Sequence, residues 1–182
     1  MTTTSKPILT VVTGPVGGGK STVSHVLAGV LREAGYKTAV IDLDLIYNMS
    51  VQNRDKWEPD NLFTARHGVA ALADVFFGDG VEIVIVDGEF FNRKELDNLY
   101  NNVTTEVDYK FVTLNVSYEE VSARVAADFS RTASRNPQIL RRLYTMFEEA
   151  QPFLKDSSLF VDADKRTPRN IAEVIVTDIR KG

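Results

Sequence analysis

The stretch that decides the fold is Ile8-Leu-Thr-Val-Val-Thr-Gly-Pro-Val-Gly-Gly-Gly-Lys-Ser-Thr22. Its second half has the G-x-x-x-x-G-K-[ST] spacing of a phosphate-binding loop, and its first half is a β-branched run typical of a buried strand. Apolar residues with helical spacing follow at Val23, Val26, Leu27, Val30 and Leu31. Because the motif requires a strand before it and a helix after it, this order predicts a site for nucleotide phosphates.

The residue types of this loop suit an anionic polyphosphate. Free backbone N–H groups at a helix N-terminus bind phosphate, and glycine lets the loop come close and adopt unusual backbone angles. The glycines are Gly14, Gly17, Gly18 and Gly19. Lys20 is expected to contact the β- and γ-phosphates, Ser21 to offer a hydroxyl ligand to Mg²⁺, and Thr22 to donate to a phosphate.

Composition narrows the class of protein. The chain has 182 residues, a net charge of −4 and no cysteine, so we expect one globular domain, residues 1–182, without disulfides or thiolate metal sites. The net charge is mildly negative, so the sequence does not indicate a positively charged surface for nucleic acid or an acidic membrane. No apolar run reaches membrane-spanning length, and the first residues lack the apolar core of a signal peptide, which favours a cytoplasmic location.

Strand and helix patterns alternate along the chain. Strands are expected over 8–13, 36–42, 81–86, 109–116 and 159–161. Gly35 is expected to stop the first helix, Ser117 and Thr167 to begin later helices, and residues 44–63 to be irregular. One helix is expected to end near Pro152. This alternation predicts an α/β fold with a parallel sheet covered by helices on both faces.

Acidic residues follow two of these strands, where ligands bind in such folds. If the second strand continues to residue 44, Asp42 and Asp44 project to the same side. One of them can orient or deprotonate an acceptor hydroxyl while the other contacts Mg²⁺ through water, and we expect Asp44 to act on the hydroxyl because it projects furthest beyond the strand. Asp87 follows the third strand at the position where a carboxylate holds a magnesium shell. We expect Gly88 to let substrate or backbone approach closely and Glu89 to contribute to the substrate site. Each acid can also act as a simple helix cap.

Basic residues cluster after the fourth strand. Arg124, Arg131 and Arg135 would share one face of a continuous helix, and we expect Arg131 and Arg135 to lie in a short lid, about 128–137, that closes over the transferred phosphoryl group. Arg66 is expected to pair with an anionic group on the acceptor. Arg141 and Arg142 are interpreted as surface residues.

In these residues the chain resembles the P-loop small-molecule kinases of the shikimate kinase, adenylylsulfate kinase and chloramphenicol phosphotransferase group. The resemblance covers nearly the whole chain and rests on four segments: 14–22, Asp42-Leu-Asp44, Arg131-x-x-x-Arg135 and 161–168. It implies the three-layer P-loop NTPase fold, with a five-stranded sheet of order 2-3-1-4-5. It also implies ATP as donor, Mg²⁺, and an adenine flanked by the segment near Asp164–Pro168. Shikimate kinases have a glycine run after the third strand, whereas here only Gly88 stands there.

The sequence thus predicts an ATP-dependent kinase that transfers the γ-phosphoryl group to a hydroxyl of a small-molecule acceptor, acting as a monomer or homodimer. The alternative is a nucleotide-binding regulatory or partner-binding module that transfers no phosphate. GTPases are disfavoured because the chain has no Asn-Lys-x-Asp segment, and transport ATPases because it has no Leu-Ser-Gly-Gly-Gln segment.

Overall fold

The computed structural model describes residues 6–50, 59–129 and 133–181. Its elements, in chain order, are β1 (Ile8–Thr13), α1 (Lys20–Glu33), β2 (Thr38–Asp42), α2 (Leu43–Ser50), α3 (Pro59–Gly78), β3 (Ile83–Asp87), α4 (Arg93–Tyr100), β4 (Asp108–Asn115), α5 (Tyr118–Ala127), the 3₁₀ turn η1 (Ala133–Arg135), α6 (Pro137–Ser157), β5 (Leu159–Asp162) and α7 (Pro168–Ile179).

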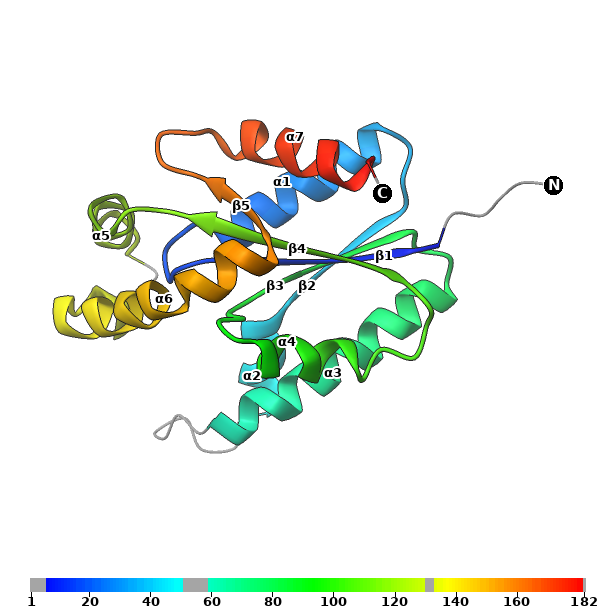
Figure 1. Cartoon of the computed structure of the whole chain (residues 1–182), viewed down its shortest axis with the longest axis horizontal. Helices are drawn as coiled ribbons and strands as arrows, with labels where there is room; N and C mark the ends of the chain where they lie inside the picture. Colours follow the sequence, from blue (N-terminus) through cyan, green and yellow to red (C-terminus); the bar gives the residue numbers. More distant parts are fainter. Residues whose placement is uncertain (1–5, 51–58, 130–132, 182) are drawn as a thin grey trace.

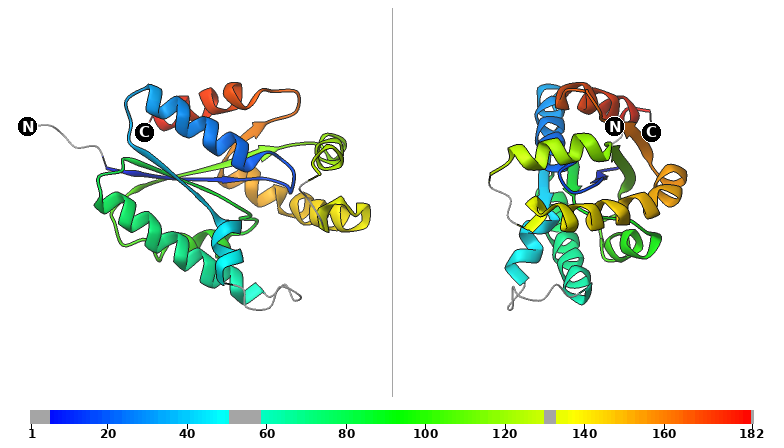
Figure 2. Two further views of the ribbon diagram at one scale, coloured as in Figure 1. Left: turned by 180° about the vertical axis from the view of Figure 1, so that it is seen from behind. Right: turned by 90° about the vertical axis from the view of Figure 1, so that its left-hand side faces the viewer.

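The sheet is parallel throughout and has the order β2-β3-β1-β4-β5, which confirms the expected topology. Helices α1 and α7 pack together on one face, whereas α3 and α4 cover the other (Figures 1 and 2). The central strands β1 and β3 are almost fully buried. A parallel sheet covered on both faces needs such continuous apolar strands.

The register brings the acidic residues to one edge of the sheet. Asp42 at the end of β2 pairs in register with Asp87 at the end of β3, and Val12 of β1 is the partner of Asp87 on the other side. All strands point the same way, so the loop after β1 opens at this edge too. The helices α5 and α6 follow β4 at the same end of the molecule (Figure 1).

Helix starts agree well with the sequence signals. Ser117 caps α5 by accepting a hydrogen bond from the Glu120 N–H, and Thr167 caps α7 by accepting one from the Asn170 N–H. Asn136 caps α6 directly before Pro137, which occupies the first turn of the helix. Gly35 has a φ of 94° after α1, where a glycine stop was expected.

Two expectations about local structure are wrong. The sequence predicts an irregular segment over 44–63, but α2 begins directly at Leu43 and α3 at Pro59. The sequence also predicts that a helix ends near Pro152, but α6 continues to Ser157. Proline removes one helical hydrogen bond, and the buried Phe147 and Leu154, one on each side of it, anchor the helix across this position.

Candidate active site

The loop over residues 14–19 joins β1 to α1 and leaves the start of that helix open. Gly19 occupies the N-cap position with a φ of 91°, a conformation that favours glycine, and no side chain caps the helix. By contrast, α4, α5, α6 and α7 all begin with a side-chain cap. The first-turn N–H groups of α1 therefore stay available to an anion, and the first turn carries no acid to repel it.

A small polar cavity of about 110 Å³ lies against this loop. It is lined by Val16, Gly17, Gly19, Lys20, Ser21, Thr22, Asp44 and Glu89. We call it the phosphate cavity. The Lys20 ammonium group donates to the carbonyl oxygens of Gly14 and Pro15, each over 3.2 Å, so its charge is held at the loop. Gly18 donates to the Pro15 carbonyl oxygen and closes the turn.

Ser21 and Asp87 meet directly. The Ser21 hydroxyl donates to Asp87 Oδ1 over 2.9 Å, while Asp87 Oδ2 is buried without a hydrogen-bond partner. Burial raises the pKa of the Asp87 carboxyl to about 6, although the hydrogen bond from Ser21 and the positive charge of Lys20 both act to lower this pKa. A buried, half-satisfied carboxylate beside a hydroxyl fits the oxygen ligands that Mg²⁺ prefers. Within the described residues, no group of three or more His, Asp or Glu side chains is arranged to hold a metal.

The two acids after β2 have different positions. Asp42 Oδ1 accepts hydrogen bonds from the Asp44 and Leu45 N–H groups, so Asp42 caps α2. Asp44 lies in the first turn of α2, is exposed, and lines the phosphate cavity. The strand ends at Asp42, so the expectation that both acids project from a continuing strand is wrong. Asp44 reaches the phosphate cavity through the turn of α2 instead.

The segment after β3 is packed tightly against the start of α2. A Cβ atom on Gly88 would lie 2.7 Å from Leu43 Cβ, so a side chain at residue 88 would push α2 away. The Thr13 hydroxyl accepts from the Phe90 N–H over 3.0 Å and fixes the segment to β1. Glu89 is thereby directed to the phosphate cavity. Burial raises the pKa of its carboxyl, and Lys20 opposes this effect.

Arg66 lies in α3, and only 1% of it is exposed. Its guanidinium group donates to the Glu89 carbonyl oxygen over 3.3 Å and lies 3.6 Å from Glu95 Oε1. Glu95 in turn accepts from the Phe91 N–H over 2.6 Å. Arg66 therefore supports the backbone that carries Glu89, and it lines neither of the cavities that contain Glu89.

Arg124 is a residue whose main contacts were not anticipated. It donates to the Gly18 carbonyl oxygen over 3.1 Å and to the Ala163 carbonyl oxygen over 3.4 Å, and it pairs with Glu120. A cavity of about 250 Å³ lies between the loop and α7, and Arg124, Arg166 and Pro168 line it. Helical spacing grouped Arg124 with Arg131 and Arg135, and this hid its link to the loop.

Arg124 and Arg135 do not lie on one continuous helix, so the condition for the expected common face of arginines is not met. Helix α5 ends at Ala127, and Arg131 lies outside the described residues. Arg135 belongs to the 3₁₀ turn η1, where its guanidinium group lies 4.9 Å from the centre of the exposed Phe129 ring. Arg135 thus lies in the connection between α5 and α6, within the segment expected to form a lid.

A second cavity, of about 330 Å³, adjoins Glu89 and is lined by Ile139, Arg142, Leu143 and Met146 of α6. We call it the α6 cavity. Arg142 is exposed, which confirms its interpretation as a surface residue, and it also lines this cavity. The signal was present in the sequence, because these four residues recur at helical spacing on a stripe separate from the buried Leu140, Tyr144 and Phe147.

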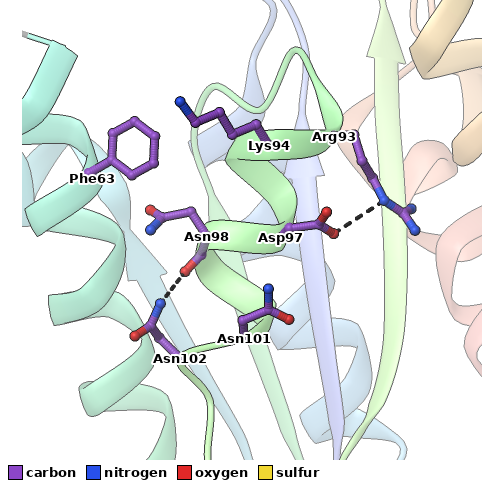
Figure 3. Close-up of a pocket in the computed structure, with 7 residues that line it drawn as sticks. All are labelled: Phe63, Arg93, Lys94, Asp97, Asn98, Asn101 and Asn102. Carbon is purple, nitrogen blue, oxygen red and sulfur yellow. Dashed lines mark hydrogen bonds and ion pairs between the residues drawn. The ribbon is translucent and has the colours of Figure 1, made fainter.

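A larger groove, of about 560 Å³, lies between α3 and α4, where Phe63 faces Lys94 and three asparagines (Figure 3). Lys94 lies 5.2 Å from the Phe63 ring centre, and Arg93 pairs with Asp97. The groove is open, and none of the site residues expected from the sequence lines it. Size alone therefore does not make it the reaction site.

The comparisons with known proteins agree with this geometry. The family model of the CobQ/CobB/MinD/ParA nucleotide binding domain matches residues 9–181. A shikimate kinase of Pseudomonas syringae is 26% identical over 162 residues, which is 88% of this chain and 90% of that protein.

No helix within the described residues has both the length and the apolar character needed to span a membrane.

Solved structures show the same fold. A gluconokinase from Sinorhizobium meliloti aligns with a TM-score of 0.70 and 18% identity over 97% of this chain and 94% of the other. A shikimate kinase from Acinetobacter baumannii, solved in complex with shikimate, aligns with a TM-score of 0.68 and 17% identity over the same shares. These matches confirm the resemblance to P-loop small-molecule kinases and the three-layer fold that it implies.

Proposed function

Because the chain belongs to the CobQ/CobB/MinD/ParA nucleotide binding domain family and resembles P-loop small-molecule kinases, we propose that it transfers the γ-phosphoryl group of ATP to a hydroxyl of a small molecule. The observation that carries the proposal is the phosphate cavity itself. Two carboxylates, Asp44 and Glu89, face the same small space as Lys20 and the uncapped start of α1. A site that only held nucleotide would need no such acids opposite the phosphates.

On the donor side, the triphosphate lies along the loop over residues 14–19, and Thr22 adds a donor at its edge. Ser21 and Asp87 hold Mg²⁺, which neutralises phosphate charge when bound. The base enters the cavity beside Arg124, Arg166 and Pro168, where a guanidinium plane and a proline ring offer flat surfaces to a purine.

On the acceptor side, Asp44 accepts a hydrogen bond from the attacking hydroxyl, with Glu89 beside it and Asp42 holding the turn. The acceptor oxygen forms a bond to the γ-phosphorus as the bond to the ADP oxygen breaks, and the hydroxyl proton passes to the carboxylate. Lys20, the loop N–H groups, Arg131 and Arg135 stabilise the charge of the moving group. Positioning and charge neutralisation supply most of the acceleration.

The acceptor substrate is held by the segment Gly88–Glu89, which Arg66 supports from behind. We propose this supporting role in place of the acceptor contact expected for Arg66, because its guanidinium group is buried and paired with Glu95. The small-molecule acceptor therefore meets Glu89 and the walls of the α6 cavity.

A regulatory module that binds nucleotide without transferring phosphate is the second candidate function. The family model favours it because the description of that family names nucleotide binding alone.

One measurement distinguishes the two candidate functions. ADP release from Mg·ATP is followed with and without a library of sugars, hydroxy acids, nucleosides and antibiotics, with mass detection of products. Acceptor-dependent ADP release with a phosphorylated product supports the kinase. Slow hydrolysis unaffected by every acceptor contradicts it.

A further inference from the structure

Glu89 connects two cavities. It lines the phosphate cavity together with Lys20 and Asp44, and it lines the α6 cavity together with Arg142 and three apolar residues. A molecule in the α6 cavity is therefore adjacent to the space where the γ-phosphate lies under the proposed function. The lining of the α6 cavity then describes the body of the acceptor.

The charges around this junction disfavour an acid. Asp44 and Glu89 are both carboxylates on the phosphate side. Under the proposed function Lys20 faces the phosphates, and Arg66 is buried against Glu95 and the Glu89 carbonyl oxygen. The charged residues that line the α6 cavity are one cation, Arg142, and one acid, Glu89. An acceptor carboxylate beside the reacting hydroxyl would therefore meet two like charges, Asp44 and Glu89, while Lys20 is directed to the phosphates.

The α6 cavity also has an apolar wall. Ile139, Leu143 and Met146 form it, and Ile139 is 40% and Met146 37% exposed. Other exposed apolar side chains lie on elements at the same edge of the sheet, namely Leu45 and Met49 of α2 and Phe129 after α5. The exposed apolar wall of the α6 cavity itself is typical of a ligand site, because covering it with an apolar ligand is favourable.

We infer that the acceptor is an uncharged molecule with a hydroxyl next to an apolar body, and not a small hydroxy acid. The inference rests on the proposed function for the placement of the hydroxyl. The hydroxyl faces Asp44 and Glu89, the apolar body packs on Ile139, Leu143 and Met146, and Arg142 donates to a neutral oxygen of the same molecule.

The test uses binding, so that it does not depend on turnover. The full chain is saturated with Mg²⁺ and a non-hydrolysable ATP analogue, and matched pairs of compounds are titrated by calorimetry. Shikimate and its primary amide differ in charge with nearly the same shape, and gluconate and glucitol differ in a carboxylate against a neutral hydroxymethyl group. Glucose and phenyl β-glucoside differ in an apolar body. We expect the neutral member to bind about tenfold or more tightly than the acid, and the phenyl glucoside to bind about tenfold more tightly than glucose.

A variant pair locates the effect. Met146→Gln should weaken the binding of phenyl β-glucoside about fivefold, because the substitution places an amide group in the apolar wall. Val174→Gln is the control, because Val174 of α7 is also 36% exposed but lies outside the α6 cavity. Melting temperatures check that both variants fold.

The inference is overturned if the acid binds more tightly than its neutral partner or if no neutral compound binds. It is also overturned if the phenyl ring gives no gain in affinity or if the two substitutions have equal effects. Its failure is distinguishable from that of the proposed function. Tight neutral binding without phosphoryl transfer from ATP contradicts the kinase alone, whereas transfer to an acid in preference to its neutral partner contradicts this inference alone.

Discussion

The Ser21 hydroxyl donates to Asp87 Oδ1 over 2.9 Å, and this bond joins the first turn of α1 to the end of β3. The two residues are 66 positions apart in the chain. The bond leaves Asp87 Oδ2 buried with no partner. A carboxylate in this state is costly to the free protein, because burial disfavours its charged form, and the cost falls when a cation binds there.

Asp87→Asn is therefore expected to stabilise the nucleotide-free protein at neutral pH. Because the folded pKa of about 6 lies above the unfolded value of about 3.9, the wild-type protein loses stability as pH rises between these values. Asparagine removes that loss, which is about 3 kcal/mol at pH 7. Denaturant unfolding at pH 7 and pH 4 measures it. The gain should vanish near pH 4, and an equal gain at both pH values would contradict the burial argument.

Asp42→Ala is expected to cost about 1 kcal/mol of stability, because Asp42 caps α2 through the N–H groups of Asp44 and Leu45. Asp42→Asn is the matched control, since asparagine caps helices about as well as aspartate. Urea unfolding compares the two. If both variants lose activity equally while stability is unchanged, Asp42 acts in chemistry and not as a cap.

Asp44→Asn is expected to lower phosphoryl transfer about 100-fold or more while changing nucleotide affinity less than about threefold. The reason is that the carboxylate accepts the acceptor's proton, whereas the loop and Lys20 hold the phosphates. Single-turnover rates and nucleotide titrations separate the two effects. Equal losses in both would assign Asp44 to nucleotide binding.

Arg66→Met is expected to cost about 2 kcal/mol of stability and to lower kcat through displacement of Glu89, with nucleotide affinity retained. Arg93→Met is the control, because Arg93 pairs with Asp97 on an exposed surface and should change stability by less than about 0.5 kcal/mol. A loss of acceptor affinity alone, with kcat and stability intact, would show instead that Arg66 contacts the acceptor.

Much of the fold was predictable because its signals are local. The segment Ile8–Thr22 contains a strand, loop and helix start in one run, and Ser117 and Thr167 cap the helices that they precede. Helix α2 was missed because its start depends on Asp42 as a cap and on Gly88 leaving room for Leu43. The passage of α6 through Pro152 likewise depends on packing at Leu154.

The candidate site was predictable where one motif contains it and less so where distant elements meet. Lys20, Ser21 and Asp87 occupy the positions that the motifs indicate. The sequence assigns Arg66 to the acceptor because its partners in the fold, Glu95 and the Glu89 carbonyl oxygen, are distant in the chain. Only folding brings them to Arg66. Arg124 was grouped by helical spacing with Arg131 and Arg135, and that spacing carries no information on its contact with the loop or on the cavity that it lines.

The central claim is that the loop over residues 14–19 and Lys20 form a cradle for a nucleotide polyphosphate. Isothermal titration calorimetry of Mg·ATP into the wild-type chain and into Lys20→Ala tests it most directly. We predict saturable binding to the wild type and at least tenfold weaker binding to the variant, with unchanged melting of both proteins without nucleotide. Absence of heat from ATP, ADP and GTP with folded wild-type protein and magnesium would contradict the account.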